Sequence, residues 1–266
     1  MKQNVLSLQV PTTAGEWTNI AKEFYIQWQY PNCIGALDGK HVQILPPANC
    51  GSLYYNYKQF NSIVLMAMAD ANYKFVFVDA GSNGRISDGG VFNSCSLSAA
   101  LTGDNVLNIP ADSKLPESDM ACPYVIVADD AFAMRRHLMK PFCARNLTNE
   151  QRIFNYRLSR ARRVVENAFG IMCSKFRVFS KAIPLAPEKA QTLVLASCCL
   201  HNFLLRNPTS TAQYISENPD PVCRLEPVAK QTVRRANNEA IEIRNNFAKY
   251  FSSPGGEVSW QMNIFN

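Results

Sequence analysis

Three acidic residues lie far apart along this chain of 266 residues: Asp38, Asp129 and Glu166. Asp38 stands inside an apolar stretch, Asp129 follows directly after another, and Glu166 lies in a pattern typical of an amphipathic helix. Carboxylates are hard oxygen ligands that suit Mg²⁺ or Mn²⁺, and like charges crowded together need a cation between them. Two such ions, about 4 Å apart, can activate water or a 3′-hydroxyl and stabilise the leaving oxygen in a phosphoryl displacement. If the fold brings the three carboxylates together, they could form a divalent-metal site that cuts phosphodiesters.

Each of the three also has an ordinary structural explanation. Asp38 and Gly39 could form a bulge or turn at a strand end, and Glu166 could be a salt-bridge partner for Arg162 or Arg163 one helical turn earlier. An ionised aspartate in a buried strand costs several kcal/mol unless a cation or strong donors lie over it. Asp38 is therefore expected to have such a partner, and both explanations stay open.

The segments around these residues alternate between strand and helix patterns, which predicts an α/β fold. Buried strands are expected at Cys33–Ile44 and Tyr124–Ala128, and a hairpin at Ile63–Ala69 and Tyr73–Val78 with Asp70 in its turn. Central strands of such folds commonly end in chemically active residues, as Asp129 would. A further strand is expected at 176–183, and helices at 13–28, 88–97 (capped by Ser87 or Asp88), 131–140, 158–173, 187–202 and 228–251.

Composition and motifs exclude several other kinds of protein. The chain has 27 Lys and Arg against 21 Asp and Glu, a net charge of +6 that is compatible with nucleic acid without being diagnostic. No GxSxG motif is present, and Cys198 with His201 lacks two further ligands for zinc. No signal peptide or run of 18 apolar residues appears, so we expect neither export nor a membrane span, and the nine scattered cysteines are expected to be reduced.

Two smaller features have local interpretations. Residues 54–58 (YYNYK) are expected either to form a sheet edge or to contact nucleic acid through stacking and Lys58. His137 stands among Arg135, Arg136 and Lys140, and is expected on a basic surface.

Six sequence blocks, in order, carry a specific resemblance. They are CIGALDGKHV, YYNYKQFNSIVLMAMAD, GSNGRISDGGVF, VIVADDAFAM, LSRARRVVENAFGIMCSKFRVF and CCLHN. Over about residues 30–202 the chain resembles the catalytic domain of PIF/Harbinger-type transposases, a family that includes the Harbinger transposase-derived nuclease of animals. The resemblance implies an α/β fold of the ribonuclease H-like type, with a mixed five-stranded sheet flanked by helices.

The resemblance also implies a DDE catalytic triad on Asp38, Asp129 and Glu166. Glu166 follows Asp129 by 37 positions, a separation typical of the family. The block GRISDGG matches a position treated as a metal ligand in the family, which adds Asp88 to the expected Mg²⁺ or Mn²⁺ ligands. Relatives often have a proline where this chain has Ala133, which puts the local loop geometry in doubt.

The chain is expected to divide into an N-terminal docking helix (1–32), the DDE catalytic domain (33–202) and a linker with a C-terminal helix (203–266). Only 37 residues precede Asp38, so the helix-turn-helix region that usually comes before it in the family is mostly absent here. The resemblance implies a Myb/SANT-like accessory protein as a partner in DNA binding and nuclear import. The expected location is the nucleus, with the cytoplasm as a second location.

The expected function is that of a metal-dependent DNA endonuclease or transposase catalytic domain. The alternative is a domesticated, catalytically silent DNA- or chromatin-binding factor with the same fold. The expected DNA phosphate contacts, which could equally form a solvated basic face, are Arg160, Arg162, Arg163, Lys175 and Arg177.

Overall fold

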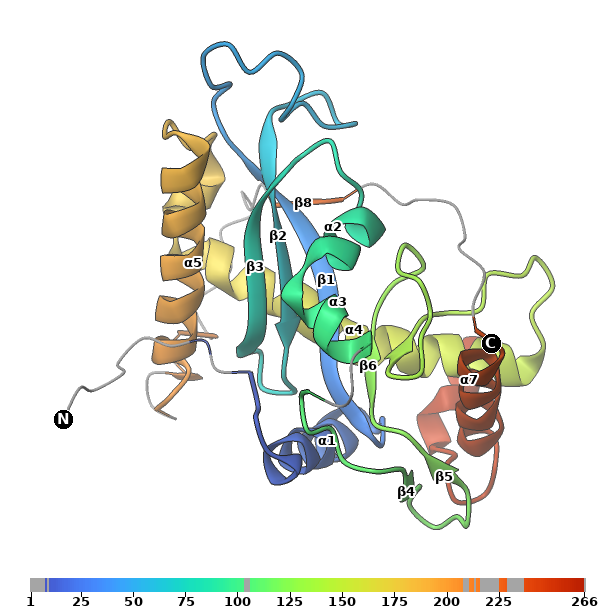
Figure 1. The fold of residues 1–266 in the computed structure, drawn as a ribbon. Coiled ribbons are helices and arrows are strands. Elements are labelled where there is room, and N and C mark those ends of the chain that lie inside the picture. Colours follow the sequence, from blue (N-terminus) through green and yellow to red (C-terminus); the bar gives the residue numbers. More distant parts are fainter. Residues whose placement is uncertain are drawn as a thin grey trace.

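A central β-sheet with helices on both faces forms the molecule (Figure 1). The computed structural model describes residues 8, 10–102, 106–207, 211–212, 214–215, 225–228 and 237–265. Its α-helices are α1 (Ala14–Trp28), α2 (Asp88–Ser94), α3 (Ser96–Thr102), α4 (Asn149–Lys175), α5 (Pro187–Leu204) and α7 (Asn238–Phe251). Its strands are β1 (Cys33–Gln43), β2 (Ser62–Ala69), β3 (Phe75–Asn83), β4 (Ser113–Lys114), β5 (Ala121–Cys122), β6 (Val125–Val127), β7 (Leu138–Met139) and β8 (Glu226–Pro227). No helix in the described ranges is long and apolar enough to cross a bilayer.

The main sheet is mixed, with β1 at its centre. Five strands follow one another in the order β3-β2-β1-β6-β7, where the β1–β2 and β2–β3 pairs are antiparallel and the β1–β6 and β6–β7 pairs are parallel. The sixth strand, β8, pairs with β1 at Lys40 and His41, beyond the part of β1 that pairs with β6. The expected mixed sheet is therefore present, with one more strand than the five predicted.

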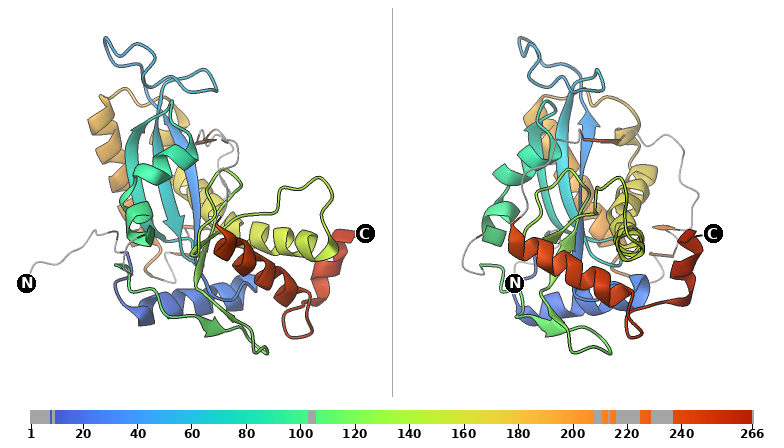
Figure 2. Two further views of the ribbon diagram at one scale, coloured as in Figure 1. Left: turned by 45° about the vertical axis from the view of Figure 1, so that its right-hand side comes forward. Right: turned by 90° about the vertical axis from the view of Figure 1, so that its right-hand side faces the viewer.

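The two faces of the sheet have different helices packed on them. One core contains Ala36 and Val127 together with apolar residues of α4, α5 and α7, and the other contains Leu37 and Ile126 with residues of α2 and α3. Figure 2 shows α7 beside α4. Because successive strand residues point to opposite faces, Asp38 and Lys40 of β1 share the α4 face with Ala36.

Local sequence explains where α1 and α4 begin, because each has a capping box at its N-terminus. Thr13 caps α1 and pairs reciprocally with Glu16, and Thr148 caps α4 and pairs reciprocally with Gln151. The helix predicted at 158–173 is the C-terminal part of α4, which runs for 27 residues. The predicted hairpin is also present, and Asp70 holds its turn by accepting hydrogen bonds from the backbone N–H groups of Asn72 and Lys74.

Four predicted elements were wrong or need new limits. Residues 131–140 form turns and β7 in place of a helix, because residues 138–139 pair with β6. Residues 177–180 form a short 3₁₀ helix in place of a strand. The helix expected at 88–97 is two helices, and Ser87 precedes the first without a side-chain capping bond. The last helix begins at 238, while residues 229–236 of its predicted span lie outside the described residues.

Candidate active site

Asp38 lies in the middle of β1 and is buried, with an exposed fraction of 4%. It is not in a bulge or turn, because β1 pairs with β2 in unbroken register from Ala36 to Gln43. Its Oδ2 atom lies 2.9 Å from the ammonium nitrogen of Lys40, which is on the same face two residues later. The contact lacks the angles of a hydrogen bond, and Oδ2 makes no other hydrogen bond. The cation expected beside Asp38 is thus an ammonium group in this structure.

Asp129 follows β6, the parallel neighbour of β1. Ala36 pairs with Val127, so Asp38 and Asp129 each stand two residues beyond a paired position and are expected on the same face. One oxygen of Asp129, Oδ1, accepts a hydrogen bond of 2.9 Å from the backbone N–H of Ala131. This bond closes a turn of the kind that aspartate side chains commonly form.

Glu166 lies on α4, the helix that packs on the face shared by Asp38 and Lys40. The Lys40 ammonium lies 5.8 Å from the ring centre of Phe169, which is one turn after Glu166. The carboxylate of Glu166 is partly exposed and forms an ion pair of 2.5 Å with Arg162, four residues earlier. The salt-bridge explanation for Glu166 therefore describes this conformation, and the helix still holds the residue on the side of the sheet where Asp38 lies.

The structure places Asp38 on the face of the sheet that α4, the helix of Glu166, covers, and the β1–β6 register predicts Asp129 on that face too. Among the described side chains, no group of three or more His, Cys, Asp or Glu residues is close enough to hold a metal ion. Asp38 and Glu166 are each engaged by a basic residue of the chain, and Asp129 by a backbone donor. Their role as metal ligands stays a prediction.

Asp88 begins α2, and its side chain lies outside the described part of the structure. The backbone next to it packs tightly on the turn after β6. A Cβ atom built on Gly89 would lie 3.0 Å from the carbonyl oxygen of Ala131. Glycine at position 89 therefore lets the start of α2 approach the segment that carries Asp129.

The five residues predicted to contact phosphates have different environments. The guanidinium of Arg160 lies 3.9 Å from the ring centre of Trp260, and Arg162 is paired with Glu166. Lys175 lies 5.8 Å from the ring centre of Tyr214, whereas Arg163 and Arg177 are exposed. Arg160 and Arg162 thus have partners within the chain, and the prediction of a shared phosphate-binding face stays untested.

The 54–58 segment lies beside β8 and does not form a sheet edge. Its residues form turns, with a single bridge between Tyr55 and Asn61. Lys58 forms an ion pair with Glu226 of β8, and the hydroxyl of Tyr57 donates a hydrogen bond of 3.0 Å to the carbonyl of Pro227. The predicted phosphate contact through Lys58 would therefore compete with its ion pair to Glu226.

His201 and Cys198 each have a partner within the described part of the chain. Burial lowers the pKa of His201 to about 4, and its two ring nitrogens lie 2.8 Å from the Tyr214 hydroxyl and 2.8 Å from the Tyr73 carbonyl oxygen. Both nitrogens therefore have partners other than a metal. The sulfur of Cys198 lies 3.8 Å from that of Met172.

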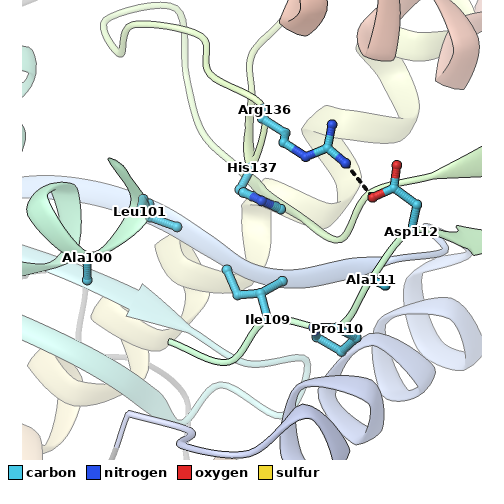
Figure 3. A pocket seen from close by; sticks show the side chains of 8 residues that line it. All are labelled: Ala100, Leu101, Ile109, Pro110, Ala111, Asp112, Arg136 and His137. Carbon is cyan, nitrogen blue, oxygen red and sulfur yellow. Dashed lines mark hydrogen bonds and ion pairs between the residues drawn. The ribbon is translucent and has the colours of Figure 1, made fainter. Parts of the chain in front are cut away.

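His137 is half-buried and lines a pocket of about 290 Å³, contrary to the prediction of a surface position (Figure 3). One ring nitrogen, Nδ1, lies 2.7 Å from the carbonyl oxygen of Tyr124, and burial lowers the pKa of the imidazole. The same pocket includes Arg136, which is paired with Asp112 and with Glu239. None of the three triad positions lines this pocket.

Comparison with protein families gives a match over the same segment that contains the three carboxylates. The model for the DDE superfamily endonuclease matches residues 37–202, which include Asp38, Asp88, Asp129 and Glu166. The chain belongs to the DDE superfamily endonuclease family. In this family member, the matched segment begins in β1 and ends in α5.

Several curated relatives are similar to this DDE protein over most of its length. The protein named "Putative nuclease HARBI1" from Bos taurus is 29% identical over 188 residues, which cover 70% of this chain and 49% of the relative. The human protein of that name is 27% identical and covers 75% and 54%. Protein ALP1-like from Arabidopsis thaliana is 24% identical and covers 82% and 56%. The chain thus spans about half the length of these relatives, and no solved structure matches it.

Sequence reasoning missed Lys40 as the partner of Asp38. The signal was present, because residues two apart in a strand point to the same face, and Lys40 follows Asp38 by two. It also missed β8, a two-residue strand whose partner in β1 lies more than 180 positions earlier in the chain. Such a distant pairing has no local sequence signal.

Proposed function

We propose that this DDE domain is the catalytic part of a divalent-metal-dependent DNA endonuclease or transposase, and that Asp38, Asp129 and Glu166 are its triad. The observation that carries the proposal is the β1–β6 register, in which both aspartates follow paired residues by two positions, beneath the helix that holds Glu166. The mixed sheet flanked by helices agrees with a ribonuclease H-like fold. The family match and the nuclease name of several relatives point to the same reaction class.

The residues suit a divalent cation in their chemistry, because carboxylate oxygens are the ligands that Mg²⁺ and Mn²⁺ prefer. Asp38 Oδ2 is a buried carboxylate oxygen with no hydrogen bond, and such an atom requires a cation partner. Asp129 is the proposed second ligand, held in its turn by the bond from Ala131, and Asp88 is the proposed additional ligand. When bound, Mg²⁺ or Mn²⁺ supplies activation of the attacking oxygen and stabilisation of the leaving oxygen of the phosphodiester.

The three carboxylates would be positioned for this reaction by the elements that carry them, and the basic residues would bind the DNA. In this proposal β1 holds Asp38 in a buried position, and the hydrogen bond from Ala131 orients Asp129. The helix α4, which carries Glu166, packs on the same face as Asp38. Glu166 is partly exposed, so its pair with Arg162 can open at little cost. Arg160, Arg162, Arg163, Lys175 and Arg177 are the proposed phosphate contacts that would hold the DNA backbone across this face.

Partners and location follow from the resemblance and form part of the proposal. DNA is the proposed substrate, and a Myb/SANT-like protein is the proposed partner for DNA binding and nuclear import. The proposed location is the nucleus, with the cytoplasm as a second location.

A second candidate function is a DNA- or chromatin-binding factor without cleavage activity. It is favoured by the ion pairs of Asp38 with Lys40 and of Glu166 with Arg162, which neutralise two of the three carboxylates without a metal. An Arabidopsis thaliana relative, 23% identical, is named Antagonist of like heterochromatin protein 1. That name describes the relative, and it makes chromatin binding worth testing for this chain.

Nicking of supercoiled plasmid DNA separates the two functions. The native chain should convert supercoiled to open-circular DNA in Mg²⁺ or Mn²⁺, and Glu166→Gln and Asp129→Asn should lose at least 100-fold of that rate. DNA binding by gel shift should be retained in both variants. Binding without nicking by the native chain would favour the second function, and equal nicking by native and variant proteins would refute the triad.

A further inference from the structure

Lys40 occupies an unusual position for a lysine. It lies in the central strand with only 13% of its side chain exposed, and its ammonium is 2.9 Å from Asp38 Oδ2. The side chain of Asp38 is 6% exposed, so both charges are largely removed from water. A buried ion pair is weak evidence for stability, because desolvation offsets much of the attraction. Stability alone therefore does not explain why this buried ion pair is present.

The surroundings of the pair show that Lys40 is the nearest identified cation to Asp38. Oδ2 has no hydrogen-bond donor besides this contact, and the Lys40 ammonium has the ring of Phe169 5.8 Å away on the opposite element, α4. Phe169 contributes no anion, so the attraction of Lys40 to this site comes mainly from Asp38. A lysine side chain has a flexible four-carbon stem, so its ammonium can leave without movement of the strand.

We propose that Lys40 is a positioning residue that acts as an exchangeable cation for Asp38: its ammonium holds the carboxylate in place before metal binding and is displaced by the divalent ion. This inference rests on the proposed function, because it assumes that Asp38 is a metal ligand. It adds that metal affinity is set partly by competition with a group of the chain itself. A divalent ion at Asp38 and an ammonium within 3 Å of the same oxygen repel each other, so one leaves when the other binds.

The competition predicts that removing the ammonium tightens metal binding. Lys40→Met keeps an unbranched apolar stem of similar length and removes the charge. With the ammonium absent, the Mn²⁺ concentration needed for half of the maximal rise in melting temperature should fall by about tenfold. Lys40→Arg keeps a positive charge and should stay within about threefold of the native value.

The experiment is a titration of MnCl₂ into EDTA-treated full-length protein, followed by thermal unfolding. Lys114→Met is the matched control, because Lys114 also pairs with an aspartate, Asp119, at 2.6 Å but on an exposed hairpin. Asp38→Asn removes the charge of the proposed metal ligand and shows how much of the response depends on it. The control should leave the Mn²⁺ midpoint unchanged, and Asp38→Asn should remove most of the response.

The outcomes distinguish this inference from the proposed function. A native response with an unchanged midpoint in Lys40→Met overturns the exchange and leaves the metal site intact. A response that appears only in Lys40→Met supports it, since the ammonium would then exclude the metal. No response in any variant overturns both proposals. If Lys40→Met does not fold, Lys40→Gln provides the same charge removal, and an unchanged midpoint there counts equally against the exchange.

Discussion

Asp38 and Arg157 are both charged and both buried, and they have opposite kinds of surroundings. Arg157, on the first half of α4, is 1% exposed and donates hydrogen bonds to the backbone carbonyls of Gly256 and Gln29 and to the side chain of Gln261. Its guanidinium also lies 4.4 Å from the ring centre of Phe251. Asp38, in contrast, has the ammonium of Lys40 beside a carboxylate oxygen that makes no hydrogen bond.

The difference separates a structural charge from one available for chemistry. Arg157 contacts two segments that are distant in sequence, and its hydrogen bonds go to neutral acceptors. It therefore joins α4 to the end of α1 and to the C-terminal segment. Burial lowers its pKa to about 10, which still leaves it protonated at neutral pH. The partner of Asp38 is the flexible side chain of a lysine, which is the basis of the proposed exchange with a divalent ion. The same contrast divides α4 into an anchoring half at Arg157 and a candidate catalytic part at Glu166.

The largest effect is expected from Arg157→Ala. The change leaves two backbone carbonyls and one side-chain amide without their donor and creates a void beside Phe251, so the free energy of unfolding should fall by about 3 kcal/mol or more. Urea denaturation measures this loss. Arg163→Ala, exposed on the same helix, is the control and should change stability by less than about 0.5 kcal/mol. Equal losses of unfolding free energy in the two variants would contradict a structural role for Arg157.

Mild acid should lower the free energy of unfolding by an intermediate amount. The titrating group is His41, on the same strand as Asp38, and Arg157 stays protonated throughout. Burial lowers the pKa of His41, three residues after Asp38, to about 4, whereas an unfolded histidine titrates near 6.5. Between these pH values the unfolded chain binds more protons than the folded chain. Above about pH 6.5 His41 therefore does not lower the free energy of unfolding, and below it the free energy of unfolding falls as the pH drops towards 4. The expected loss is about 2 kcal/mol from His41, and His201 should add a similar amount.

Urea midpoints measured from pH 7 to pH 4.5 check this dependence. His41→Gln should flatten the slope relative to the native chain, because the variant no longer takes up the extra proton on unfolding. Arg157→Ala should be less stable at every pH and keep the native slope. A native slope in His41→Gln would show that His41 does not titrate as its burial predicts.

The smallest effect is expected from Arg162→Ala. Its ion pair with Glu166 is an i, i+4 pair with both side chains partly exposed, so its loss should cost no more than about 0.5 kcal/mol. Thermal and urea unfolding should therefore be almost unchanged. A loss above about 1 kcal/mol would mean that the second part of α4 is also a structural anchor, which would weaken the contrast with Arg157.

The sequence was sufficient for features whose causes are local. The apolar run around Asp38 predicted β1, the Asp70 turn predicted the hairpin, and 3.6-residue periodicity predicted α1, α5 and the C-terminal part of α4. It failed where distant pairing decides the structure. Residues 138–139 became β7 because they pair with β6, and Arg160 packs against Trp260, a hundred positions later.

The candidate site divides in the same way. Its residue types and the alternation within β1 could be taken from the sequence, and alternation alone could have identified Lys40 as the neighbour of Asp38. The alignment of Asp38 with Asp129 could not, because it depends on the register between two parallel strands. The ion pair of Glu166 with Arg162, in contrast, follows an i, i+4 spacing that could be taken from the sequence.

Calorimetric titration of Mn²⁺ into the native chain and into Asp129→Asn tests the shared metal site most directly. The account predicts measurable binding to the native chain and at least a tenfold weaker affinity in the variant, because one of the two register-matched carboxylates loses its charge. Equal affinity in the two proteins, or no binding to either, would contradict it.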